Sequence, residues 1–78
     1  MGKNANVISI NKEEWIPAIQ KEISHWIEFS ESVFCESPSD KQNALDNVNS
    51  LKQFLEMVES NTLTQQQFEK YLYAYFLL

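Results

Sequence analysis

The sequence predicts an all-α fold, a small three-helix bundle preceded by an extended N-terminal arm. Apolar residues recur every three or four positions along most of the chain, which is the period of a helix that buries one face. Three residues that typically cap helices, Asn11, Ser37 and Thr64, stand just before these periodic segments. We therefore expect helices over about residues 12–34, 38–59 and 65–77.

Residues 1–10 are expected to form the arm or a short strand, and residues 11–78 a single helical domain. The run V-I-S-I at residues 7–10 is rich in β-branched side chains and too short for a helix. Because the sequence offers it no partner strand, the arm either lies against the bundle or pairs with its copy in a dimer. Trp15, close by in the first helix, either holds this arm in a staple-like contact or anchors a partner.

The first helix is expected to begin after Asn11, whose side chain can accept from a free N–H group of the first turn. Glu14 follows three residues later and can reach back as in a capping box. Pro17 removes one backbone hydrogen bond, so either the helix bends there or its regular part begins near Ile16. The apolar stripe then continues through Ile19, Ile23, Trp26, Ile27, Val33 and Phe34.

The second and third helices are expected to pack as an antiparallel hairpin against the first, because short loops favour antiparallel neighbours. Ser37, with Pro38 in the first helical position, is a typical helix start. Asn61 can adopt the left-handed backbone conformation that ends a helix. Thr64 and Gln67 have the spacing of a capping box for the third helix.

The charge pattern argues against nucleic-acid and membrane partners. The formal net charge is -5, and the six basic residues are all lysines, spread singly along the chain. Nucleic-acid binders need a clustered basic footprint, usually with arginine, so we expect no direct contact with nucleic acid. The C-terminal apolar run is far shorter than the roughly 20 residues of a membrane span. A single cysteine and the lack of a long apolar stretch at the start favour the cytoplasm.

No catalytic, cofactor-binding or metal site is expected, so we predict that the protein is not an enzyme. Cys35 and His25 are the residues that suggest nucleophilic chemistry, but their spacing turns them in different directions. The nearby Glu31 and Glu36 disfavour a thiolate. One histidine and one cysteine cannot supply the four ligands of a zinc site, and a single glycine cannot form a glycine-rich phosphate loop.

The C-terminal run Y-L-Y-A-Y-F-L-L, residues 71–78, contains no charged residue. One row of this helix is expected to face inward: Phe68, Leu72, Tyr75 and Phe76. The other large side chains point elsewhere, and one small bundle cannot cover them all. Either the helix is sunk in the core with its tyrosine hydroxyls reaching water, or this surface binds a partner. We favour the second and name these candidate partner-binding residues: Met57, Tyr71, Tyr73, Phe76, Leu77 and Leu78.

The sequence thus favours a protein-binding module, a small regulator, inhibitor or adaptor that acts through a hydrophobic and aromatic helical interface, as a homodimer or with another protein. The alternative is an acidic decoy, such as a DNA mimic or an immunity-type inhibitor, that occupies a nucleic-acid-binding protein. The acidic face would then consist of Glu22, Glu28 and Glu31. In composition, the chain is similar to small regulatory or antagonist proteins of bacterial or mobile-element origin.

Overall fold

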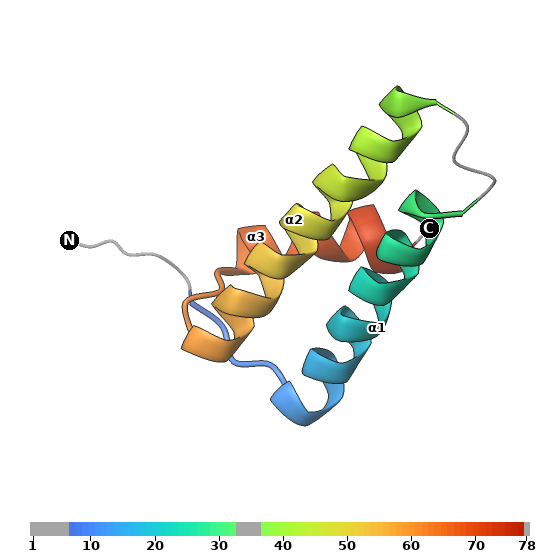
Figure 1. Ribbon diagram of the computed structural model, residues 1–78. Coiled ribbons are helices and arrows are strands. Elements are labelled where there is room, and N and C mark those ends of the chain that lie inside the picture. Colours follow the sequence, from blue (N-terminus) through green and yellow to red (C-terminus); the bar gives the residue numbers. More distant parts are fainter. Residues whose placement is uncertain (1–6, 33–36, 78) are drawn as a thin grey trace.

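The computed structural model describes residues 7–32 and 37–77, and it confirms an all-α fold of three packed helices (Figure 1). Helices α1 and α2 run antiparallel, and the third helix with its C-terminal extension crosses one face of this pair. The elements are α1 (Lys12–Ser30), α2 (Pro38–Ser60), α3 (Gln65–Tyr71) and the π-helix η1 (Leu72–Phe76), which continues α3 without a break.

Helix α1 begins where the sequence predicts. Asn11 is its N-cap, and the side chain accepts a hydrogen bond from the backbone N–H of Glu14 at 3.3 Å. The helix runs through Pro17, which is exposed, so its regular part does not wait for Ile16. Solvent can therefore hydrate the carbonyl that this proline leaves without a donor.

Helix α1 ends at Ser30, earlier than the expected residue 34. The Oγ of Ser30 donates to the carbonyl of Ile27 at 2.7 Å, and the Oγ of Ser32 donates to Phe29 at 2.9 Å. Such short-range hydroxyl bonds compete with the backbone ladder of a helix. Residues 33–36, which the predicted helix included in part, lie outside the described residues.

The start and end signals of α2 and the start signal of α3 are confirmed. The Oγ of Ser37 accepts from the N–H of Asp40 at 3.1 Å, and Asn61 closes α2 at φ 60° and ψ 38°, in the left-handed region. Thr64 and Gln67 form a reciprocal capping box, in which the N–H of each residue donates to the side-chain oxygen of the other.

The third helix differs from a continuous α-helix over residues 65–77, because it widens into η1 after Tyr71. The N–H of Leu77 donates to the carbonyl of Leu72 at 2.9 Å, a bond that spans five residues as in a π-helix. The hydroxyl of Tyr75 donates to Oδ1 of Asn47 on α2 at 3.2 Å. This side-chain bond ties η1 to the middle of α2.

The core lies where α3 crosses the α1–α2 pair, and Phe54 at its centre is completely buried. The buried cluster consists of Ile19, Ile23, Val48, Leu51, Phe54, Val58, Leu63 and Tyr71. All three helices and the α2–α3 loop contribute to it. This shared core fixes the directions in which the remaining faces of α3 and η1 point.

The described part of the arm lies against the bundle, one of the two arrangements that the sequence left open. Val7 forms an isolated antiparallel bridge with Thr64, and the N–H of Ile8 donates to the carbonyl of Leu63 at 2.9 Å. Ile8 and Ile10 also pack against the core. The arm therefore acts as a strap over the start of α3.

Candidate protein-binding surface

The structure separates the predicted partner-binding residues into three groups. Tyr73 and Leu77 are 64 % and 56 % exposed and lie on η1. Met57 and Phe76 are half-buried, and Tyr71 is buried with 7 % of its surface accessible. Leu78 lies outside the described residues.

The expectation that Tyr71 points away from the bundle is wrong. Its ring stacks on Phe54 of α2, with ring centroids 4.7 Å apart and planes 3° from parallel. The reason is that α3 lies across both other helices. It turns one row of side chains toward α1 and a second row, with Tyr71 and Tyr75, toward α2, so its buried stripe is wider than on a helix with one neighbour.

Phe76 also belongs largely to the core, because it packs edge-on against Trp15 of α1 at a centroid distance of 5.4 Å. Trp15 makes a similar edge contact with Phe68 at 5.3 Å. Aromatic rings prefer such T-shaped arrangements to face-to-face contact. Trp15 therefore joins α1 to α3 and η1.

What remains exposed on η1 is a narrow apolar ridge formed by Tyr73, Ala74 and Leu77, which we call the η1 ridge. Tyr73 and Leu77 are four residues apart, so they lie along the same side of the segment. This ridge points away from the rows that pack on Trp15 and Phe54. It is the part of the predicted interface that the fold leaves free.

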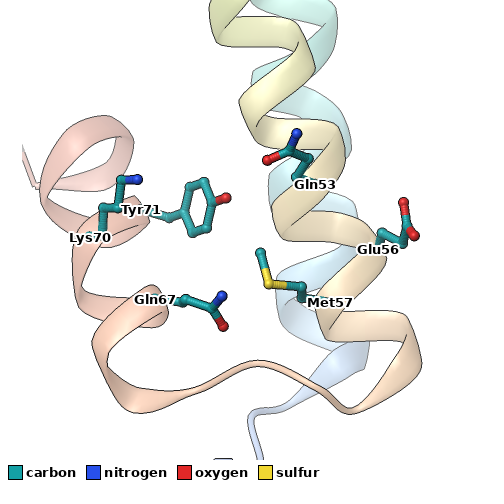
Figure 2. Close-up of a pocket in the computed structure, with 6 residues that line it drawn as sticks. All are labelled: Gln53, Glu56, Met57, Gln67, Lys70 and Tyr71. Carbon is teal, nitrogen blue, oxygen red and sulfur yellow. The ribbon is translucent and has the colours of Figure 1, made fainter.

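A groove runs between α2 and α3 (Figure 2). It has a volume of about 410 Å³ and is lined by Gln53, Glu56, Met57, Gln67, Lys70 and Tyr71. The thioether of Met57 and the amide of Gln67 point into it, and the ring of Tyr71 faces it from α3, whereas Glu56 points outward (Figure 2). We call this the α2–α3 groove.

The groove combines an apolar floor with polar groups that have bonding capacity to spare. The side-chain oxygen of Gln67 is occupied by its capping box with Thr64, which leaves the amide nitrogen for a ligand. The side chain of Gln53 forms no hydrogen bond with any other residue that the structure describes. Lys70 likewise forms no ion pair within these residues. Burial in the core, and then the neighbouring Tyr75, raise the pKa of Tyr71 above 10.0, so its hydroxyl stays protonated at neutral pH.

Sequence reasoning found two of the six groove residues, Met57 and Tyr71, through their apolar character. Gln53, Glu56, Gln67 and Lys70 were missed because polar residues on exposed helix faces carry no signal of their own. The spacing of the polar residues could have indicated the groove. Gln67, Lys70 and Tyr71 share one side of α3, and Gln53 lies four residues before Met57 on α2.

The three residues of the alternative acidic face do not lie together. Glu28 and Glu31 are exposed and Glu22 is half-buried. At about 100° per residue, Glu22 and Glu31 project from nearly opposite sides of the helix. A basic partner would therefore have to approach α1 from two directions to meet all three carboxylates.

The remaining candidates for chemistry are scattered. His25 is exposed at the edge of Trp26, with ring centroids 5.5 Å apart, and Cys35 lies outside the described residues. Among residues 7–32 and 37–77 no group of three or more histidine, cysteine or acidic side chains could hold a metal ion. Within these same ranges, none of the helices contains an apolar stretch of the length that a membrane span requires.

Comparison of the chain with protein-family models, with curated proteins and with solved structures found no match.

Proposed function

We propose that the protein is a non-enzymatic protein-binding module, a small regulator, inhibitor or adaptor, which acts through the η1 ridge. The observation that carries the proposal is the exposure of Tyr73 and Leu77, at 64 % and 56 %, next to aromatic residues that the core has already buried. Exposed aromatic and aliphatic side chains on a rigid helical segment are typical anchors of protein interfaces.

The ridge is well suited to this role because its base is held in place. Phe76 packs on Trp15, and Tyr75 is hydrogen-bonded to Asn47, so η1 is fixed on two sides. A fixed ridge loses little conformational entropy when it binds, which favours affinity. The short π-helix also supports the proposal, since such segments frequently occur at functional sites.

Sedimentation velocity of the purified protein over a micromolar to millimolar range tests the proposal, together with affinity capture from the native source. Tyr73→Glu and Leu77→Glu should each weaken self-association or capture by roughly tenfold or more, because a charge enters the contact. Helicity by circular dichroism should not change. Ser24→Glu, which adds the same charge on the exposed side of α1, serves as the control.

The proposal is wrong if the wild-type protein stays monomeric at millimolar concentration and any captured partner binds the two ridge variants as tightly as the control. An acidic decoy would behave differently, since its binding would fall with salt and with Glu22, Glu28 and Glu31 changed to glutamine.

A further inference from the structure

We infer that the α2–α3 groove is a binding site for a small aromatic carboxylate, a free acid of about the size of phenylacetate. Its carboxylate bonds to Gln67, Lys70 and Tyr71 of α3, and its ring lies against Met57 of α2. The site goes beyond the proposed function, because Tyr73 of the η1 ridge points about half a turn around the segment from Tyr71. The groove and the ridge therefore serve different ligands.

The observation that points to a ligand is the unpartnered hydroxyl of Tyr71. This residue is buried, with 7 % of its surface accessible, and its ring is held by the stack on Phe54. The hydroxyl forms no hydrogen bond with any residue that the structure describes, and it points across the groove toward α2 (Figure 2). The hydroxyl of Tyr75, by contrast, is bonded to Asn47. Polar groups of buried side chains usually have a partner, so this hydroxyl marks a position for a ligand atom.

The groups beside this hydroxyl are hydrogen-bond donors, and together they favour an anionic acceptor. The side-chain oxygen of Gln67 is taken by Thr64, so its NH2 group is what remains for a ligand. Lys70 adds an ammonium group that forms no ion pair among the described residues. Burial raises the pKa of Tyr71, so its hydroxyl stays protonated and can donate at neutral pH. Because these residues are three and four positions apart, their donors share one side of α3 and can converge on one carboxylate.

The acidic residues near the groove leave this position open to an anion. Glu56 lines the groove, but its carboxylate points outward and away from Tyr71 (Figure 2). Glu69, which is exposed, accepts a hydrogen bond from the side chain of Gln65 at 2.8 Å. With a net charge of -5, the protein offers no long-range attraction to an anion. Recognition therefore depends on the local donors, and the affinity is modest.

The rest of the groove sets the size and the apolar body of the ligand. Its volume of about 410 Å³ lies in the lower part of the range of small-molecule pockets. The thioether of Met57 points into the groove, and sulfur makes favourable contacts with the edges of aromatic rings. This side chain is flexible, so it adapts to a flat ring. An apolar floor with a few converging polar groups is typical of small-molecule sites.

An NMR titration of the full chain with phenylacetate tests the inference. The backbone amide signals of Gln67, Lys70 and Tyr71, and the side-chain NH2 signal of Gln67, should shift and saturate with a Kd of roughly 1 mM or tighter. Two matched compounds separate the two halves of the ligand. Phenylacetamide keeps the ring and lacks the charge, and acetate keeps the charge and lacks the ring, so each should bind at least tenfold more weakly.

Three variants each remove one donor. Tyr71→Phe removes the hydroxyl and keeps the ring that stacks on Phe54. Gln67→Glu keeps an oxygen for the capping box and replaces the NH2 donors by a negative charge. Lys70→Gln removes an exposed ammonium group. The first should weaken phenylacetate binding about threefold, and the other two about tenfold or more. Lys41→Gln, which removes an exposed charge outside the groove, should bind like the wild type.

Four outcomes overturn the inference. The carboxylate site is rejected if phenylacetate causes no saturable shift at the groove signals, if phenylacetamide binds equally well, or if all three variants bind like the wild type. Tighter binding of a short peptide that ends in phenylalanine would show that the groove takes a chain end instead of a free acid. The proposed function is tested separately, since Tyr73→Glu should bind phenylacetate like the wild type while it weakens self-association or capture.

Discussion

The ring of Tyr71 on α3 lies parallel to the ring of Phe54 on α2, with centroids 4.7 Å apart. Phe54 is completely buried, and it also lies within 6.1 Å to 6.4 Å of the rings of Trp15, Phe68 and Phe76. One side chain of α2 thus contacts aromatic residues from α1, α3 and η1. The stability of the three-helix arrangement depends on this point more than on any exposed residue.

Phe54→Ala should lower the free energy of unfolding by about 3–5 kcal/mol, because it removes a buried ring and leaves a cavity. For a domain of this size that is a large share of the total stability. Urea denaturation followed by circular dichroism measures the change. Lys52→Ala, an exposed change on the same helix, should stay within about 0.5 kcal/mol of the wild type. A small loss for Phe54→Ala would contradict the central role of this ring.

Alkaline pH should destabilise the protein through Tyr71, whose pKa is raised by burial and by Tyr75 above 10.0. Between the unfolded and the folded pKa, the unfolded chain binds fewer protons at this phenol than the folded one does. Stability from this group is therefore complete below about pH 10 and is lost as pH rises through the folded pKa. Urea midpoints measured from pH 8 to pH 11 should fall less steeply in Tyr71→Phe. Tyr73→Phe, changed at an exposed ring, should follow the wild type.

Pro17→Ala should stabilise the protein by about 1–3 kcal/mol. Proline inside a helix costs about 3 kcal/mol relative to alanine, and Pro17 is exposed, so little packing is lost on replacement. Thermal and urea unfolding provide the measurement. Gln20→Ala, at an exposed position of the same helix, should change stability by a few tenths of a kcal/mol. If Pro17→Ala destabilised the protein, the continuous course of α1 through residue 17 would be wrong.

Asn47→Ala should cost about 1 kcal/mol, because it leaves the hydroxyl of Tyr75 without its 3.2 Å acceptor on α2. The effect on η1 itself should be larger than the effect on the stability of the whole domain. Amide hydrogen exchange at Leu77, whose N–H bonds to the carbonyl of Leu72, should quicken as η1 loosens. Asn49→Ala, an exposed neighbour on α2, should leave that exchange rate unchanged. Equal exchange rates in both variants would show that the hydrogen bond does not hold η1.

The helix starts could be predicted from the sequence because capping is local. Asn11, Ser37 and Thr64 bond to N–H groups within the next three residues, and Asn61 needs only its own backbone conformation. The end of α1 could not be predicted from the sequence in this way. The apolar period continues beyond Ser30, but the hydroxyl bonds of Ser30 and Ser32 end the helix, and periodicity alone carries no information about them.

The candidate surface was predicted in part. Tyr73 and Leu77 are exposed on η1 as the sequence analysis proposed, whereas Tyr71 is buried. The error came from assigning the third helix a single inward row. Where a helix crosses two others, the width of its buried stripe depends on tertiary geometry. The π-helix after Tyr71 contacts Trp15 through Phe76 and Asn47 through Tyr75, and both of these partners lie far away in the sequence.

The bridge between Val7 and Thr64 joins two positions that are separated by α1 and α2 together. Closing so long a loop costs entropy before any contact repays it, so the strap should form late in folding, after the helices have assembled. For the same reason it should be among the earliest contacts to open. The amide of Ile8, bonded to Leu63, would then report the first step of unfolding from the native state.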